Sequence, residues 1–415
     1  MKNNLSEGIF FSKKSNILTF FKTEMEAELA SILDWWMENM IDETNGGFYG
    51  KIDAQNQLHP EADKGVILNT RILWTFSAAA NSTKNKEYEN IAHRAFEYLV
   101  VHFFDKKNGG LYWMLDYQGK PTQTKKQIYA LAFGIYGLSE YYHLTKNKKA
   151  IELANELFEV IEEHSFDKIH GGYFEAFTED WQAIEDLRLS EKDANEAKTM
   201  NTHLHIMEAY MNLYRVFPNK KIGDALQALI ECFLEKFIKP KSSLSGRHAK
   251  HLHLFFDEKW NSKSNAISYG HDIECSWLLQ EAAEILGNKK LLQKVKETAL
   301  EMATATLENG FDNSGGIMYE KENNHFDKEK HWWVQAEAVV GFFNAYEISK
   351  EEKFVKASLK CWGFIKQNIL DRENGEWVWS IFPDGKISQM EDKAGAWKAP
   401  YHNGRMCLEI IKRMN

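Results

Sequence analysis

Polar side chains occur at helical spacing in the segment "MNTHLHIMEAYMNLY" (200–214), whose other residues are mostly apolar or aromatic. Asn201, His205, Glu208 and Asn212 are four, three and four residues apart, so on a helix they form one polar stripe. Such a stripe requires water or a polar cavity beside it, because burial of unpaired polar groups is costly. A stripe on the protein surface is the alternative, which the aromatic and methionine-rich surroundings weaken.

A histidine and a carboxylate also lie together in "SYGHDIECSW" (268–277), just ahead of an apolar segment. His271, Glu274 and Trp277 are spaced three apart and therefore share a face near the expected start of a helix. A carboxylate beside an imidazole raises its basicity and fixes its tautomer, as a general base requires. Taken alone, the segment fits a structural arrangement that caps the helix better than it fits a catalytic one.

Three further segments carry isolated side chains of chemical interest. In "KAGAWKAPYHNGR" (393–405), a loop with Trp397 leads into a helix that carries His402, and in "HWWVQAEAVVGFF" (331–343) Trp333 and Glu337 share one face. These tryptophans are also suited to a buried turn or a core. In "GVILNTRILWTF" (65–76), Arg71 stands alone in an apolar helix. Burying an unpaired guanidinium is costly, so we expect Arg71 to reach into a polar pocket.

The His-x-His pair of His203 and His205 resembles a metal site in spelling only. On a helix the two side chains point about 200° apart, whereas helical metal pairs use spacings of three or four. We therefore predict no metal centre and no cofactor. The pooled set of His205, His271, His402 and Arg71 contains no obvious nucleophile, and we find no phosphate-binding loop. Two candidate bases and a cation that can hold negative charge on oxygen suit proton transfer next to a carbonyl.

These side chains must be positioned by helices, because only six prolines interrupt the chain and long stretches show helical periodicity. Between the helical stretches an Asp, a tight glycine turn and a short aromatic piece recur roughly every 60 residues. A worn copy is expected in "SGRHAKHLHLFFDEKW" (245–260), where one gap is of double length. The clear copies are "DETNGGFYG" (42–50), "DKKNGGLYW" (105–113), "DKIHGGYFE" (167–175), "DNSGGIMYE" (312–320) and "DRENGEWVW" (371–379).

Each repeat has room for two helices, so the chain predicts six helix pairs. We expect an all-α fold, an (α/α)6 barrel with short β-hairpins in the loops at one end, formed by residues 1–415 as a single domain. In a closed double ring, loops at one end gather residues from every repeat into one pocket. An open helical solenoid is the alternative, but its repeats are usually shorter and lack the aromatic hairpin.

The composition limits the partners of the protein. A formal charge of −9 opposes binding to nucleic acid or to anionic membranes, and no stretch is apolar enough to span a bilayer. The four cysteines are scattered without a CxxC pair, which favours free thiols in the cytoplasm. The 13 Trp, 16 Tyr and 26 Phe fill a core or line a sugar pocket. We expect a monomer or a weak homodimer with a sugar as its substrate.

Four motifs in order, "NTHLHIMEAY", "SYGHDIECSW", "HWWVQAEAVVGF" and "KAGAWKAPYHNGR", resemble the cellobiose 2-epimerases of the N-acylglucosamine 2-epimerase superfamily. The resemblance covers nearly the whole chain and implies an (α/α)6 barrel that needs no metal or nucleotide. It implies that His271 and His402 are the two acid/base catalysts on opposite sides of the sugar C2. It also implies that His205, with Asn201, assists ring opening, and that Arg71 steadies an enediolate.

The remaining roles implied by the resemblance are those of substrate-binding residues. Glu274 and Glu337 would orient histidines and sugar hydroxyls, and the other side chains would contact the sugar: Tyr129, Asp193, Trp333 and Trp397. The implied reaction is epimerisation at C2 of the reducing-end sugar of a β-1,4-linked disaccharide. Superfamily members that epimerise mannose or N-acylglucosamine, or isomerise aldose to ketose, are the near alternatives. A glycoside hydrolase would use two carboxylates instead, and a non-catalytic sugar-binding protein would not need His271 and His402.

Overall fold

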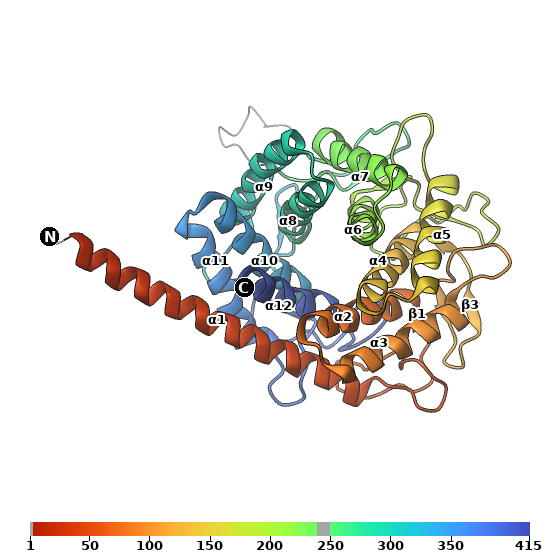
Figure 1. The fold of residues 1–415 in the computed structure, drawn as a ribbon, viewed down its shortest axis with the longest axis horizontal. Coiled ribbons are helices and arrows are strands. Elements are labelled where there is room, and N and C mark those ends of the chain that lie inside the picture. Colours follow the sequence, from red (N-terminus) through yellow and green to blue (C-terminus); the bar gives the residue numbers. More distant parts are fainter. Residues whose placement is uncertain (1–2, 239–249) are drawn as a thin grey trace.

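The computed structural model describes residues 3–238 and 250–415, and its architecture is a double ring of helices (Figure 1). The inner ring closes on itself, because each inner helix packs against the next and the last packs against the first. In chain order these inner helices are α2 (Val66–Thr83), α4 (Ile128–Thr145), α6 (Met200–Val216), α8 (Tyr269–Leu286), α10 (Trp332–Ser349) and α12 (Tyr401–Arg413).

The outer ring is formed by the helices that alternate with these along the chain. Each outer helix packs against the inner helix before it, while α1, at the start of the chain, packs against α12. The predicted (α/α)6 barrel is therefore confirmed, and closure by the two chain ends excludes the open solenoid. The outer helices are α1 (Asn3–Asn39), α3 (Lys86–Tyr98), α5 (Lys148–His164), α7 (Lys220–Cys232), α9 (Lys289–Asn309) and α11 (Glu352–Phe364).

Two kinds of helix follow from two kinds of sequence. The outer helices α3, α5, α7 and α9 each begin after an asparagine whose side chain accepts a backbone N–H, and each buries one apolar stripe. Three outer helices end in a π-helical turn: η1 (Leu99–Phe103), η2 (Phe233–Phe237) and η3 (Ile365–Ile369). The inner helices are buried on nearly all sides over their first three turns. None of the described helices is both long and apolar enough to cross a membrane.

Glycines let the inner helices approach one another closely. A Cβ atom at Gly137 of α4 would lie 2.8 Å from the carbonyl oxygen of Thr70 on α2. At Gly341 of α10 it would lie 2.7 Å from the carbonyl oxygen of Ile273 on α8. Both contacts are with backbone atoms, which cannot move aside as a flexible side chain would. These positions therefore keep the inner ring narrow.

Short antiparallel strands mark the end of the barrel at which the inner helices begin. Five two-residue strands run directly into inner helices: β1 (Lys64–Gly65), β4 (Lys126–Gln127), β6 (Lys198–Thr199), β8 (Ile267–Ser268) and β11 (Lys330–His331). They pair as β1–β2–β3, β4–β5, β6–β7, β8–β9–β10 and β11–β12. The partners are β2 (Met114–Leu115), β3 (Pro121–Gln123), β5 (Ala176–Phe177), β7 (Phe255–Phe256), β9 (Glu320–Glu322), β10 (His325–Asp327) and β12 (Ser380–Ile381).

In four of the five glycine turns, an ion pair joins the aspartate to a lysine directly before the next inner helix. Asp42 accepts the backbone N–H groups of its own turn and pairs with Lys64 at 2.7 Å between Oδ2 and Nζ, both side chains being fully buried. The same link recurs in three further repeats, as Lys126–Asp105, Lys198–Asp167 and Lys330–Asp312, whereas Asp371 pairs with Lys393 in the loop before α12. Buried pairs of this kind fix register more than they add stability. These ion pairs fix the glycine turns to the end of the barrel at which the inner helices begin, which we call its mouth.

The worn repeat uses a different fastening. Part of it, residues 245–249, lies outside the described residues, and residues 250–260 form the expected hairpin that contains β7. Here Asp272 of α8 accepts hydrogen bonds from the backbone N–H of Leu252 at 2.8 Å and from His251 Nδ1 at 2.6 Å. Both carboxylate oxygens of Asp272 therefore bond the hairpin, although Asp272 follows His271 directly in the sequence.

Candidate active site

A layer of charged and aromatic side chains crosses the barrel one and a half turns into the inner helices. It is built from the same position on each of them: the sixth residue of five helices and the fifth of α12. Its members are Arg71, Phe133, His205, Glu274, Glu337 and Arg405. All six are buried. Sequence repeats far apart in the chain thus converge on one plane, as the closed ring predicts.

His402 is oriented by a carboxylate of the neighbouring helix. Its Nδ1 lies 2.7 Å from Oε1 of Glu337, while Oε1 of Glu274 is 4.0 Å away. An ionised carboxylate only accepts hydrogen bonds, so Nδ1 carries the proton and Nε2 carries the lone pair. No other described side chain bonds to Nε2. The imidazole is therefore arranged as a base that points its free nitrogen away from its anchor.

His205 is held in the same manner within its own helix. Its Nδ1 lies 2.8 Å from Oε2 of Glu208, three residues further on, so the expected polar stripe places these two groups in contact. Tyr401 donates to the other oxygen of Glu208 at 2.5 Å. His203, on the opposite face, accepts from the backbone N–H of Tyr173 and bonds the carbonyl of Thr199. Both nitrogens of His203 are therefore engaged by backbone groups.

His271 differs from the other two histidines in its anchor. The expectation that Glu274 fixes its tautomer is wrong, because Nδ1 of His271 bonds Oγ of Ser268 at 2.8 Å and Glu274 bonds Arg405. A serine hydroxyl can donate or accept, so this imidazole can carry its proton on either nitrogen. The side chain of His271 contacts the ring of Trp333 at 4.9 Å, and that ring lies 5.6 Å from His402. Both histidines therefore border one aromatic wall.

The surroundings keep the three imidazoles neutral. Loss of water around His271, with a smaller contribution from His205, lowers its pKa to about 3. Burial, followed by the charges of Arg71 and Arg405, lowers the pKa of His402 well below its usual value. Burial also lowers the pKa of His205, although Glu208 opposes the shift. At neutral pH each imidazole therefore keeps a free lone pair that can accept a proton, while the lowered pKa makes it a weaker base than a histidine in water.

Arg71 is a buried cation without a carboxylate partner among the described residues. Its Nη2 donates to the hydroxyl of Tyr129 at 2.8 Å, and its Nη1 donates to the carbonyl oxygen of Trp397 at 3.2 Å. Its guanidinium carbon lies 4.4 Å from the ring centre of Phe133 and 4.9 Å from that of Tyr401. Cation–π contacts with these rings thus stabilise the guanidinium, and because no carboxylate neutralises it, its charge can stabilise an oxygen anion.

Aromatic side chains from several repeats complete the wall of the site. Tyr129 lies 5.0 Å from His205 and 6.1 Å from Trp397, measured between ring centres. Trp397 in turn lies 5.8 Å from Trp113. Trp113 was missed by sequence analysis, although it belongs to one of the recurring aromatic pieces. The wall combines flat apolar faces with the hydroxyl of Tyr129, which suits a sugar ring.

Asn201 is the second residue of α6, and Asp193 lies in the loop that precedes β6 and α6. The side-chain oxygen of Asn201 is buried without a hydrogen-bond partner among the described residues. Asp193 accepts from the backbone and hydroxyl of Ser190, at 2.9 and 3.0 Å, in the loop between β5 and β6. Burial, with a minor contribution from Asp193, raises the pKa of Glu175 to about 8. These hydrogen bonds of Asp193 thus stay within its own loop.

Glu274, Glu337 and His402 form a cluster with metal-like spacing among the described residues, their ligand atoms lying within 4.8 Å of one another. The guanidinium of Arg405 already occupies this cluster, donating from Nη2 to both glutamates at 2.6 Å. Its fixed positive charge supplies what a cation would supply there. Arg405 was not among the predicted site residues, although it ends the segment "KAGAWKAPYHNGR" (393–405).

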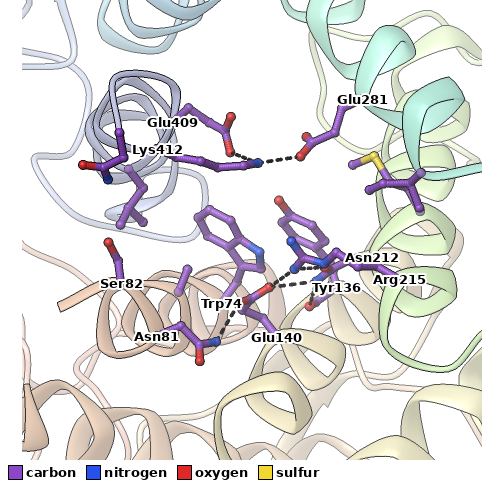
Figure 2. Close-up of a pocket in the computed structure, with 15 residues that line it drawn as sticks. Trp74, Asn81, Ser82, Tyr136, Glu140, Asn212, Arg215, Glu281, Glu409 and Lys412 are labelled. Carbon is purple, nitrogen blue, oxygen red and sulfur yellow. Dashed lines mark hydrogen bonds and ion pairs between the residues drawn. The ribbon is translucent and has the colours of Figure 1, made fainter. Parts of the chain in front are cut away.

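A second hollow lies at the opposite mouth of the barrel (Figure 2). It encloses about 450 Å³ and is separated from the histidines by Trp74 and Tyr136, which stack 5.0 Å apart. Its charged groups are paired with one another, Glu140 with Arg215 at 2.5 Å and Glu281 with Lys412 at 2.9 Å. Asn212, at the end of the expected stripe, bonds a backbone carbonyl here instead of reaching the site.

Fold and site together define an (α/α)6-barrel protein with a buried layer rich in histidines and carboxylates. Residues 47–404 match the family model of N-acylglucosamine 2-epimerase, and the chain belongs to that family. It is 50% identical over 393 residues to the cellobiose 2-epimerase of Bacteroides fragilis, with 94% of this chain and 98% of that one covered. It is accordingly a carbohydrate epimerase, an isomerase.

Solved structures agree with this assignment. The cellobiose 2-epimerase of Bacillus thermoamylovorans superposes with a TM-score of 0.90 at 40% identity, covering 95% of this chain and 100% of that one. A D-mannose isomerase superposes with a TM-score of 0.81 at 22% identity, covering 94% and 97%. The second likeness shows a shared fold.

Proposed function

We propose that the protein interconverts glucose and mannose configurations at C2 of the reducing-end sugar of β-1,4-linked disaccharides, converting cellobiose to glucosyl-mannose and lactose to epilactose. The observation that carries the proposal is the pair His271 and His402, two neutral imidazoles that border the ring of Trp333. The buried layer that crosses the barrel holds the guanidinium of Arg71, which bonds Tyr129 and has no carboxylate partner among the described residues. The relatives at 38–50% identity are named cellobiose 2-epimerase, which supports a disaccharide as the substrate.

The reaction requires the sugar ring to open, because only the aldehyde makes the proton on C2 acidic. His205, with Asn201, assists opening and binds the oxygens on C1 and C2. One of the two catalytic histidines then removes the C2 proton, and a cis-enediolate forms. The anion is stabilised by the charge of Arg71. Rotation about the C2–C3 bond presents the other face, and the second histidine returns a proton there.

The remaining groups of the site orient the sugar in this scheme. Trp333 and Trp397 supply the flat faces against which sugar rings stack, and Tyr129 offers a hydroxyl beside them. Asp193 would meet the second sugar unit from its loop at the mouth. Glu337 contributes through His402, whose tautomer it fixes. The buried oxygen of Asn201 gains a partner when a sugar hydroxyl donates to it.

The test is incubation of the protein with cellobiose in D2O, followed by NMR of the sugars. We expect glucosyl-mannose to form and deuterium to enter at C2 of both epimers, since the abstracted proton exchanges with solvent. Methyl β-cellobioside, whose ring cannot open, serves as the matched control and should remain unlabelled. Release of glucose would point to a hydrolase, formation of a ketose as main product to an isomerase, and no change to a sugar-binding protein.

Activity is expected to survive removal of divalent metal ions. Arg405 neutralises the carboxylates that a cation would need, and neutral histidines supply the proton transfers. Dialysis against EDTA should leave the rate of cellobiose epimerisation within about twofold of the untreated protein. Complete loss that one particular divalent ion restores would contradict the two-histidine scheme.

We further infer that the protein works in the cytoplasm as one domain. Its four cysteines are free thiols, three of them buried, which suits a reducing compartment. The contact of α1 with α12 joins the two ends of the chain in one ring.

A further inference from the structure

Arg405 bonds three buried carboxylates, although it is not one of the groups that transfer protons in the proposed reaction. Its side chain is 1% exposed, and its Nη1 donates to Oε1 of Glu208 and to the hydroxyl of Tyr401. Its Nη2 donates to Glu274 and Glu337, each at 2.6 Å. One guanidinium of α12 thus links carboxylates from α6, α8 and α10 across the barrel.

Two of these carboxylates are the anchors of histidines. Glu208 holds Nδ1 of His205, and Glu337 holds Nδ1 of His402. Resting on the function proposed above, we propose that Arg405 is the positioning residue of the site: its guanidinium orients the anchoring carboxylates and thereby fixes two of the three histidines. Arg405 acts through these groups and forms no contact with the aromatic wall formed by Trp333 and Trp397.

Charge balance explains why a cation must stand at this place. Three carboxylates that are each 1% exposed would protonate in an apolar interior unless a positive charge offset the loss of water. Although burial opposes it, Arg405 is the main cause that lowers the pKa of Glu208 to about 2. Burial, then the charge of Glu337, raises the pKa of Glu274 to about 8. Without Arg405 these carboxylates would bind protons more readily.

The geometry also explains why the cation is an arginine. Four hydrogen bonds leave from two nitrogens in one plane, a pattern that the guanidinium fork provides and a lysine ammonium does not. Arg71 cannot substitute for it, because Arg71 bonds Tyr129 and a carbonyl and reaches no carboxylate. The two buried arginines therefore have separate tasks. In the proposed reaction Arg71 stabilises the oxygens on C1 and C2, while Arg405 orients the carboxylates that anchor His205 and His402.

The primary variant is Arg405→Met, which removes the charge and the fork while keeping similar bulk. We expect kcat for cellobiose to fall by ~10², the usual worth of a well-placed general base, with little change in KM. Arg405→Lys keeps the charge and should lose less. Arg215→Met is the matched control, since it removes a guanidinium paired with buried Glu140 at the opposite mouth. It should keep kcat within about twofold.

The pH profile separates a positioning role from a general loss of packing. The carboxylates that anchor imidazoles, Glu208 and Glu337, hold the tautomers when they are ionised. Burial raises the pKa of Glu337 and Arg405 opposes that rise, as it does for Glu208. Activity should therefore fade as pH falls through these two pKa values, and removal of Arg405 should raise both. The acidic limb of kcat/KM should therefore move upward by about one unit or more in Arg405→Met, and should stay near wild type in Arg405→Lys. The charged and titratable groups around this guanidinium are Arg71, His205, Glu208, Glu274, Glu337, Tyr401 and His402.

Nitrogen NMR of the histidine side chains gives a readout that does not depend on catalysis. In the wild type, His205 and His402 should be neutral with the proton on Nδ1, and in both Arg405 variants the signals should shift toward mixed tautomers. A folded Arg405→Met protein with wild-type kcat, pH profile and tautomers would overturn the proposal. If Arg405→Met fails to fold, Arg405→Lys decides by the same signals. Wild-type protein that never epimerises cellobiose, yet shows these tautomers, would refute the proposed function alone.

Discussion

Replacing His402 with asparagine is expected to lower kcat for cellobiose epimerisation by at least ~10², the contribution of a positioned general base. The variant removes an imidazole whose Nδ1 is anchored at 2.7 Å to Glu337 and whose Nε2 is free. Sugar binding should largely persist, because Arg71, Trp333 and Trp397 remain. The measurement is the steady-state rate of glucosyl-mannose formation, with KM compared between the two proteins.

His271→Asn should abolish net epimerisation equally well, yet the two variants should differ in solvent exchange. Each retains one base, so each can still exchange the C2 proton of one epimer, gluco in one variant and manno in the other. Deuterium uptake at C2, followed separately for cellobiose and glucosyl-mannose, assigns each histidine to a face. His143→Asn, at the opposite mouth, is the control and should behave as wild type. Near wild-type rates in both site variants would make these histidines structural.

Arg71→Met is expected to lower kcat/KM by ~10²–10³, comparable to loss of a donor from an oxyanion site. The enediolate is the charged species of the scheme, and Arg71 is the buried cation beside it with no carboxylate to neutralise it. For the same reason the variant leaves no buried carboxylate unpaired, so it should fold. The measurement is kcat/KM for cellobiose, together with thermal unfolding to check stability.

Two comparisons sharpen the Arg71 experiment. Arg215→Met again controls for loss of a guanidinium, and its rate should not fall. The C2 exchange rate in D2O should drop in Arg71→Met along with epimerisation, since both require the enediolate. If C2 exchange stayed unchanged while epimerisation slowed, Arg71 would not stabilise the enediolate. It would then assist the rotation about the C2–C3 bond.

Much of the architecture could be predicted from repetition alone. Regular spacing of apolar residues defines helices, and recurring glycine turns every 60 residues or so define helix pairs, which leaves a closed ring as the simplest packing. The same logic places His205, His271 and His402 toward one end of the barrel, because each lies within the first two turns of an inner helix. Periodicity tells which residues share a face of one helix, and it correctly placed His205 beside Glu208.

Partners across helices could not be predicted in this way. Glu274 lies one turn from His271 in the sequence, yet it bonds Arg405, and His271 bonds Ser268 instead. The choice depends on how far and at what angle two helices face each other, which spacing within one helix does not encode. The buried lysines Lys64, Lys126 and Lys198 were missed for the same reason, although a lysine just before an apolar helix was a visible signal.

The common direction of the inner helices has an electrostatic consequence. All six begin at the mouth that holds the histidines, so the positive ends of their backbone dipoles converge there, each equivalent to roughly half an elementary charge. His271 and His402 lie within the first turn, where this field is strongest. The field disfavours an imidazolium and favours an enediolate, while the negative ends meet Arg215 and Lys412 at the other mouth. The end of the barrel that holds the histidines thus carries a positive backbone field, which suits the anionic intermediate of the proposed reaction.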